Sequence, residues 1–330
     1  MLFSDPAYLF LFFPLVVAGA ALVARVARTE AVLTFLFLAS CLFYVGWGVD
    51  YLVTMLASIL VNWLAAHLLL RLEDGRRALR RGIFLVGLAA NLGALIYFKY
   101  AFYFDVWAPE AGSAAAAPSF EPGLIAIPVG ISFYTFQQIV FLQDALRRDT
   151  HVVDYIGAAR GMGATAAGFI RYASFVAFFP QLVIGPIVYL SEFAPQVQRR
   201  GFGLIRRADL EIGLFIFVVG LFKKIVVADN LAYIVDPVFE AAGAGEKIGT
   251  LAAWAAAFGY YAQLYFDFSG YSDMALGSAR MLGIVLPINF ASPLKADSIS
   301  DYYKRWHVTL TRVIARFLYT PLSLWGARVA

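Results

Sequence analysis

The sequence predicts an all-α, multi-pass integral membrane protein. Hydrophobic residues make up 62% of its 330 residues and charged residues only 15%, whereas a typical soluble domain has about 25% charged residues. A membrane helix needs roughly 20 apolar residues to cross about 30 Å of hydrocarbon. Seven runs without a charged residue approach that length, at 7–24, 31–49, 51–70, 82–98, 122–143, 172–191 and 248–266. A soluble chain could bury one such helix but not seven.

The first run is interpreted as a membrane helix and not as a cleavable signal peptide. Asp5 precedes it, no basic residue stands ahead of it, and no small-residue cleavage site leads into a soluble chain. The single cysteine, Cys41, falls in the second run, so the sequence predicts no intramolecular disulfide and no redox chemistry.

The basic residues predict the orientation of the chain. Arg25 and Arg28 follow the first run, and "RLEDGRRALRR" (71–81) follows the third, whereas the loop at 101–121 has no Lys or Arg. The positive-inside rule therefore places the N-terminus outside and the arginine-rich loops in the cytoplasm, as expected for a protein of the cytoplasmic (inner) membrane. We interpret the net charge of +4 as this topology signal and expect no nucleic-acid partner.

The run at 172–191 does not fit simple alternation across the membrane. It has basic residues on both sides and contains Pro180 and Pro186, which remove backbone donors and break helices. Such breaks occur at membrane depth only inside protein or beside a water-filled cavity. We therefore expect a re-entrant segment that enters and leaves on the cytoplasmic side.

Four stretches place polar groups in apolar surroundings: "IPVGISFYTFQQIVFLQD", "FFPQLVIGPIV", "GLFKKIVVADNLA", and residues 267–307. Because intramembrane polar residues usually face a bundle interior or a cavity, we expect these stretches to surround one shared channel. For any one glutamine, a hydrogen bond between helices is the competing interpretation.

His307 lies at the end of the fourth stretch. Ser298 and Asp301 form the Ser-x-x-Asp pattern of a helix start, and apolar residues then recur at helical spacing, at Trp306, Leu310, Val313 and Phe317. The spacing predicts a helix with His307 on an apolar strip beside Tyr303, Leu310 and Ile314. A basic face would consist of Lys304, Arg305, Arg312 and Arg316.

Two interpretations of His307 stay open at this point, a catalytic group and a hydrogen-bonded core residue. The other histidines are weaker candidates, because His67 is alone in an apolar run and His151 lies in a charged loop. No group of Cys, His and carboxylate residues has the spacing of a zinc site, and no Gly-x-Ser-x-Gly motif occurs. The sequence therefore predicts no metal and no bound cofactor.

Five phrases occur in the order found in one known family: "IPVGISFYTFQ", "FFPQLVIGPIV", "GLFKKIVVADNLA", "YFDFSGYSDMALGSARMLGIVLPINFASP" and "YYKRWHVTLTRVIARFLYTPL". The chain resembles the membrane-bound O-acyltransferases (MBOAT) over nearly its whole length. Within that family it resembles the alginate O-acetyltransferase branch, with the D-alanyl transfer protein of lipoteichoic acid as a relative. The resemblance implies a single domain over residues 1–330, with many helices around a central pore.

The resemblance also implies an activity in polysaccharide modification, such as alginate biosynthesis. A thioester donor in the cytoplasm, acetyl-CoA or an acyl carrier protein, would supply an acyl group. The acceptor would be a hydroxyl of an exported polysaccharide or of a periplasmic or extracellular acetyltransferase partner, with membrane lipid around the protein. A transporter or flippase is the alternative, since it would also use broken helices and buried charges.

By similarity, the fourth stretch helps to build the chamber wall beside His307, the expected catalytic residue. The expected supporting residues are Gln137, Gln181, Asp267, Ser269, Tyr271, Asp273, Arg280, Asn289, Arg305 and Trp306. Because a lone Asp at mid-membrane costs roughly 2.5–3.5 kcal/mol, we expect Asp267, Asp273 and Arg280 to have buried partners. The alternative is that these charges only fix a helix break at Gly270.

The resembling family has a second histidine motif that does not occur in this sequence. Its members carry a second histidine, commonly held to be essential, in a Trp-His-Gly-type motif after the segment that matches "RWH". We therefore expect a C-terminally truncated sequence, with activity of these 330 residues alone in doubt, or a shortened, non-catalytic relative. In the full-length protein His307 would act directly or position that second histidine.

The predicted topology can be tested by cysteine labelling in a Cys41→Ser background. We expect Ala115→Cys to react with a membrane-impermeant reagent from outside, because its loop lacks the basic residues that mark cytoplasmic loops. Cysteines placed within residues 71–81 should react from the cytoplasm only. Labelling of position 115 from the cytoplasm alone would overturn the scheme.

Overall fold

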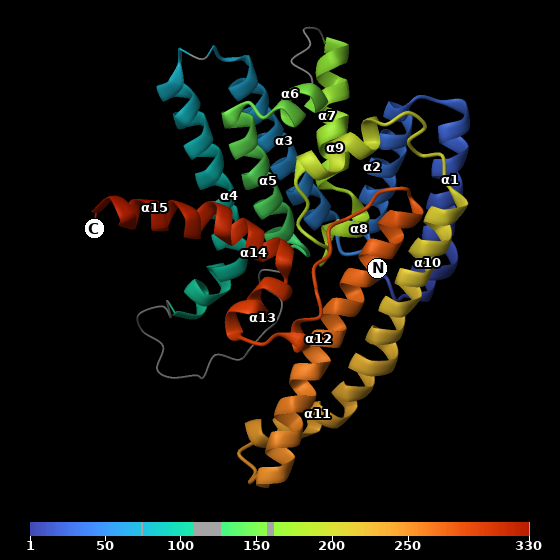
Figure 1. Cartoon of the computed structure of the whole chain (residues 1–330), viewed down its shortest axis with the longest axis vertical. Coiled ribbons are helices and arrows are strands. Elements are labelled where there is room, and N and C mark those ends of the chain that lie inside the picture. The colour runs from blue at the N-terminus through green and yellow to red at the C-terminus, as the bar shows by residue number, and fades with distance from the viewer. Residues whose placement is uncertain (74, 108–126, 157–161, 330) are drawn as a thin grey trace. The chain divides into compact units, whose positions relative to one another are not determined.

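The computed structural model describes residues 1–73, 75–107, 127–156 and 162–329, and every regular element in these ranges is a helix. The prediction of an all-α protein is confirmed (Figure 1). The described chain divides into two compact units that are interleaved in sequence. The first comprises Met1–Phe35, Ile184–Val188 and Pro195–Ala330, and the second Leu36–Val183 and Tyr189–Ala194. The single domain over residues 1–330 stays a prediction.

Two predicted segments lie partly outside the described residues. They are the loop at 101–121, of which 108–121 are not described, and the run at 122–143, of which 122–126 are not described.

Three described helices are long and apolar enough to cross a membrane: Tyr8–Val26, Val49–Arg71 and Arg77–Lys99. Thr29–Val45 is an apolar helix of 17 residues and therefore shorter. These four helices correspond to the first four predicted runs. The prediction of a multi-pass membrane protein is thus supported by the described part of the chain.

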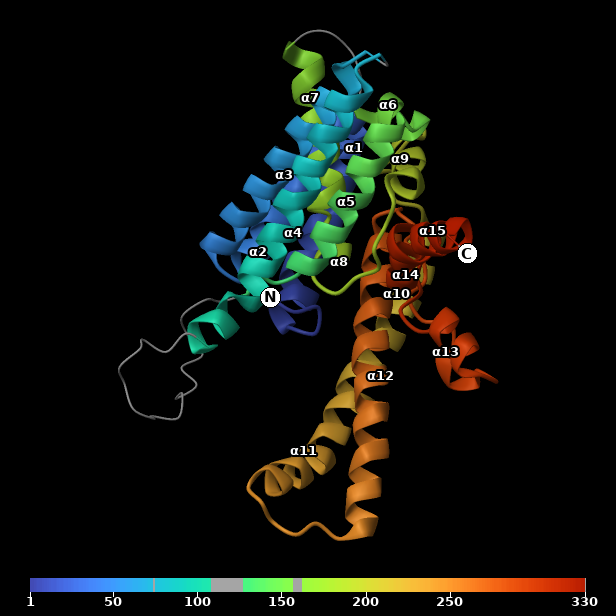
Figure 2. The same cartoon turned by 90° about the vertical axis from the view of Figure 1, so that its left-hand side faces the viewer.

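The second unit is a bundle of helices, several of them from the predicted runs. Its elements are α2 (Thr29–Val45, from Leu36 on), α3 (Val49–Arg71), α4 (Arg77–Trp107), α5 (Ile131–Arg147), α6 (Thr150–Ile156), α7 (Met162–Val176), α8 (Phe179–Leu182) and the first half of α9 (Leu190–Gln198). Helices α3, α4 and α5 run side by side (Figures 1 and 2).

Hydrogen bonds between helices hold this bundle together. Gln138 of α5 donates from Nε2 to the Ser58 hydroxyl of α3 (3.1 Å) and accepts at Oε1 from the Tyr172 hydroxyl of α7 (3.2 Å). Asn62 of α3 and Asn91 of α4 bond each other reciprocally, at 3.1 and 2.7 Å. For Gln138, the interpretation as a link between helices is confirmed.

The run at 172–191 is broken as its prolines predict. Helix α7 ends at Val176, and Pro180 lies in the first turn of the short helix α8. Residues 185–189, which include Pro186, have no regular structure before α9 begins at Leu190. The placement of both ends of the run on the cytoplasmic side stays a prediction.

The first unit contains a long helical hairpin. Helix α10 (Arg207–Leu221), the π-helical turn η2 (Phe222–Ala228) and α11 (Asp229–Gly243) follow one another without a break. They pack along α12 (Thr250–Met281), which has 32 residues, as both views show (Figures 1 and 2). The unit also contains η1 (Tyr8–Phe12), α1 (Phe13–Val26), η3 (Pro293–Lys295), α13 (Ile299–Arg305), α14 (Val308–Ile314), η4 (Ala315–Tyr319) and α15 (Thr320–Val329).

Paired glycines bring α10 and α12 into backbone contact. A Cβ atom on Gly277 would lie 2.6 Å from the main-chain oxygen of Gly213, and one on Gly270 would lie 2.8 Å from that of Gly220. The two pairs are seven residues apart on each helix. Small residues at a helix–helix contact let the two backbones approach closely. Gly270 therefore packs inside a continuous α12, and the predicted helix break at Gly270 is wrong.

Replacing glycine by alanine should have opposite effects on stability at Gly277 and Gly93, because only Gly277 packs against another helix backbone. Gly277→Ala should lower the free energy of unfolding by about 1–3 kcal/mol, because the new Cβ overlaps the backbone of α10. Gly93→Ala in α4 should have no such cost, because nothing lies within 4 Å of its Cβ position, and alanine favours helix by about 0.5–1 kcal/mol. Thermal denaturation of the purified variants measures both, and equal stability of the two would contradict the packing.

Candidate functional site

The helix predicted through His307 is interrupted at that residue. Ser298 caps α13 as predicted, because its hydroxyl accepts a hydrogen bond from the Asp301 main-chain N–H (3.1 Å). Helix α13 ends at Arg305, and α14 begins at Val308. His307 itself is in the left-handed region, with φ 45°, which costs a non-glycine residue of order 1–3 kcal/mol. The prediction of one apolar strip from Tyr303 to Ile314 is therefore wrong.

The same break divides the predicted basic face. Lys304 and Arg305 belong to α13, whereas Arg312 lies on α14 and Arg316 in η4. These residues do not form one face of one helix.

His307 is held by polar contacts to the segment after α12. Its Nδ1 lies 2.8 Å from the Asn289 side-chain oxygen Oδ1, and the Val308 main-chain N–H donates to the Asn289 main-chain oxygen (2.9 Å). The Thr309 hydroxyl donates to the same Oδ1 (2.9 Å) and accepts from the Ile187 main-chain N–H (3.0 Å). These contacts fix His307 and the first two residues of α14.

Aromatic rings pack beside the imidazole. The edge of Phe268 meets the His307 ring at a centroid distance of 4.9 Å and an interplanar angle of 87°. Phe290 packs edge-on against both Phe268 and Trp306, at 4.9 and 5.0 Å, and Trp306 stacks on Tyr302 at 5.7 Å. Trp306, a predicted site residue, thus belongs to the wall of this cluster.

Burial among these groups favours a neutral imidazole. His307 lies outside the three helices that are long and apolar enough to cross a membrane, and its partial burial lowers the pKa from 6.5 to about 4. A buried histidine is easier to hold in the uncharged form. At neutral pH His307 is therefore an uncharged ring that can accept a proton.

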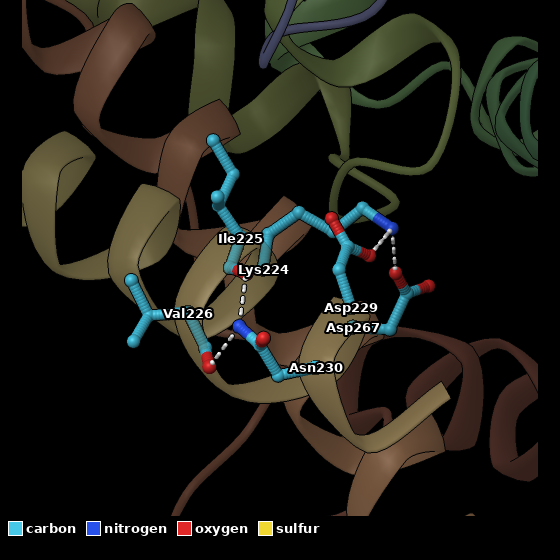
Figure 3. Close-up of polar contacts among 6 residues, drawn as sticks. All are labelled: Lys224, Ile225, Val226, Asp229, Asn230 and Asp267. Carbon is cyan, nitrogen blue, oxygen red and sulfur yellow. Dashed lines mark hydrogen bonds and ion pairs between the residues drawn. The ribbon is translucent and has the colours of Figure 1, made fainter. Parts of the chain in front are cut away.

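A second polar cluster joins the π-helical turn to α12 (Figure 3). The Lys224 ammonium contacts the Asp229 carboxylate at 2.7 Å and the Asp267 carboxylate at 2.6 Å. Asn230 donates to the main-chain oxygens of Ile225 and Val226, at 3.2 and 2.9 Å. Asp267, one of the predicted site residues, is therefore a partner in an ion pair.

Asp273 and Arg280 are paired as well. Lys223 contacts Asp273 at 2.6 Å, and Arg280 contacts Asp209 of α10 at 2.9 Å. The expectation that these charges have partners is confirmed, but the pairs are only partly buried, and Asp267 keeps 46% of its side-chain surface exposed. The partners come from the neighbouring helix and not from α12 itself. Arg305 pairs with Asp301 of its own helix at 2.8 Å.

Two other predicted residues of α12 are buried. Ser269 is 1% exposed and Tyr271 is 5% exposed, and neither hydroxyl has a hydrogen-bond partner among the described residues. The Tyr271 ring stacks on Phe3 at a centroid distance of 4.7 Å. Both are therefore core positions of the first unit.

Gln137 and Gln181 belong to the second unit. Gln137 on α5 is 4% exposed, and Gln181 on α8 is 3% exposed and donates to the Phe175 main-chain oxygen. The shared chamber predicted from all these residues would join both units and stays a prediction.

Sequence reasoning missed Ser272, Thr309 and Asp209 as site residues. The Ser272 hydroxyl accepts from Asn289 Nδ2 (3.3 Å), so it is part of the His307 network. Residues 272, 289 and 309 all lie in the stretches that resemble the family, but the sequence does not show that Ser272 and Thr309 meet at Asn289.

The profile of the membrane-bound O-acyltransferase family matches residues 162–329. A peptidoglycan O-acetyltransferase of Helicobacter pylori is 36% identical over 346 residues, which cover 100% of this chain and 63% of that protein.

The names of two further relatives refer to alginate and to teichoic acid instead of peptidoglycan. A probable alginate O-acetylase, AlgI, of Pseudomonas aeruginosa is 34% identical over 99% of this chain and 58% of that protein. A teichoic acid D-alanyltransferase of Bacillus subtilis is 27% identical over 60% of this chain and 46% of that protein. The chain thus spans about six tenths of the length of the first two relatives.

The Lys224 cluster predicts a loss of stability when its cation is removed. Lys224→Met should lower the free energy of unfolding by about 1–2 kcal/mol, because it leaves two carboxylates without their partner. This is less than the ~3–5 kcal/mol for a fully buried pair, since all three side chains keep part of their surface exposed. Thermal denaturation of the purified membrane protein measures the effect.

Two variants serve as controls for Lys224→Met. Adding Asp267→Asn should restore part of the stability, because it removes one uncompensated charge. Arg207→Gln should change little, because the Arg207–Glu211 pair is exposed. If Lys224→Met is as stable as Arg207→Gln, the cluster contributes nothing.

Proposed function

Because the chain belongs to the membrane-bound O-acyltransferase family, we propose that it catalyses acyl transfer across a membrane. An acetyl or similar acyl group would pass from a cytoplasmic thioester, acetyl-CoA or an acyl carrier protein, to a hydroxyl outside the cytoplasm. The acceptor would be an exported polysaccharide or a partner transferase. The names of the relatives support this class of acceptor, since they include a peptidoglycan O-acetyltransferase and probable alginate O-acetylases.

The observation that carries the proposal is the imidazole of His307, held at a helix break against Asn289 within the family match. A neutral imidazole can take the proton of an acceptor hydroxyl as its oxygen attacks the thioester carbonyl. The new C–O ester bond forms, the C–S bond breaks, and the leaving thiolate takes up the proton that the imidazolium releases, which restores the neutral ring. Such proton transfer typically contributes ~10²–10⁴-fold.

The charged residues of α12 have another role in this proposal. The carboxylates of Asp267 and Asp273 contact Lys224 and Lys223, so they balance charge between packed helices and are not the base. The protein would lie in the cytoplasmic membrane with its N-terminus outside, as the arginine distribution indicates.

His307→Ala tests the proposal in the full-length protein. We expect acyl incorporation into polymer, normalised to membrane-inserted protein, to fall by ~10²–10⁴-fold, the contribution of general acid–base catalysis. Insertion should change little, because alanine keeps the backbone and removes only the ring. His67→Ala and His151→Ala are matched controls that should keep most of the activity, since neither residue lies in one of the four polar stretches that resemble the family.

Three results of this experiment would count against the proposal. Full activity of His307→Ala would remove His307 from the site. Equal losses in all three histidine variants would indicate a structural effect. Transport of polymer without donor-dependent acylation would favour a transporter or flippase.

A further inference from the structure

Asn289 contacts His307, Val308 and Thr309 through its side chain and its main-chain oxygen. Its side chain is 1% exposed and lies between α12 and α13. Oδ1 faces His307 Nδ1 and the Thr309 hydroxyl, Nδ2 donates to the Ser272 hydroxyl, and the main-chain oxygen accepts from Val308 N–H. Both ends of the amide are therefore used.

The Thr309 hydroxyl supports this orientation of the amide. It accepts a hydrogen bond from the Ile187 N–H, so its own proton needs an acceptor. Asn289 Oδ1 lies 2.9 Å away and is one. With the amide reversed, Nδ2 would face Thr309 instead, and the hydroxyl proton would lose that acceptor. A buried polar group without a partner costs about 1–3 kcal/mol.

The same oxygen lies 2.8 Å from His307 Nδ1. A side-chain amide oxygen accepts hydrogen bonds and donates none, so the nitrogen that faces it must carry the proton. We propose that Asn289 is a positioning residue that holds the proton of His307 on Nδ1 and thereby makes Nε2 the atom that accepts a proton.

The catalytic meaning of this assignment rests on the proposed function. A neutral imidazole carries one proton, and a hydrogen bond to one ring nitrogen decides which nitrogen is left to act as a base. With the proton on Nδ1, the lone pair at Nε2 would receive the acceptor hydroxyl's proton. With the proton on Nε2, the lone pair would face Asn289 Oδ1, where no proton arrives.

Nuclear magnetic resonance of the full-length protein in membranes tests the tautomer directly. The protein would be labelled with ¹⁵N and ¹³C histidine, and the spectrum of His307→Gln would be subtracted to identify the His307 signals. We expect ring shifts of the Nδ1–H tautomer at pH 7. An Nε2–H tautomer in the native protein would overturn the proposal, and this result needs no further variant.

Variants at position 289 separate positioning from packing. Asn289→Leu removes the acceptor at similar size, so the His307 proton should move to Nε2. Asn289→Asp keeps an oxygen acceptor and should retain the proton on Nδ1. Asn230→Leu is a matched control, because the Asn230 amide bonds main-chain oxygens near the π-helical turn, and it should leave the His307 signals unchanged. An unchanged tautomer in Asn289→Leu would contradict the proposal.

Acyl transfer by the same variants distinguishes this proposal from the proposed function. Asn289→Leu should lower turnover within the ~10²–10⁴-fold range of general acid–base catalysis, and Asn289→Asp should recover part of it. If the native tautomer is Nδ1–H but no acyl group is transferred, the proposed function fails and the tautomer assignment stands. If transfer occurs and the tautomer is Nε2–H, only the positioning role fails.

Discussion

The first unit depends on the close approach of α10 and α12. At Gly213 and Gly277, and again at Gly220 and Gly270, main-chain oxygen atoms occupy the space that a side chain would need. Dispersion contacts between the two backbones replace side-chain packing there. The short distance also allows lysines of the π-helical turn to reach carboxylates of α12. Packing and charge compensation therefore depend on the same glycines.

One face of helix α12 packs against α10 and the π-helical turn, and another face contacts the histidine site. Gly270, Asp273 and Gly277 recur three and four residues apart and face α10 and the π-helical turn. Phe268 and Ser272 are one turn apart and contact His307 and Asn289. Because one rigid helix carries both faces, the packing on one side fixes the position of the site on the other.

Sequence patterns predicted the features whose physical cause is local. The apolar runs predicted the four helices between Tyr8 and Lys99, the prolines predicted the broken run after Val176, and Ser298 predicted the start of α13. The cost of charge in apolar surroundings predicted that the α12 charges have partners. Each of these inferences uses residues within a few positions of one another.

The errors concern features fixed by distant contacts. A helix break at Gly270 was the alternative explanation of the α12 charges, but α12 is continuous there, and the backbone of Gly220, 50 residues away in sequence, packs against Gly270. The break at His307 was missed because apolar spacing resumes in α14 and conceals two non-helical residues. The left-handed backbone of His307 is held by hydrogen bonds from Val308 and Thr309 to Asn289, which no local pattern encodes.

The group that faces His307 Nδ1 is a neutral amide and not a carboxylate. A carboxylate facing His307 Nδ1 would stabilise the imidazolium and raise its pKa, whereas the neutral Asn289 amide can accept the same hydrogen bond without that effect. The aspartates of α12 are instead paired with lysines on the face toward the π-helical turn. The imidazole thus stays uncharged in its aromatic surroundings. An uncharged ring is the form that a proton-accepting role requires, so the placement of charge and the choice of an amide at position 289 favour the same chemistry.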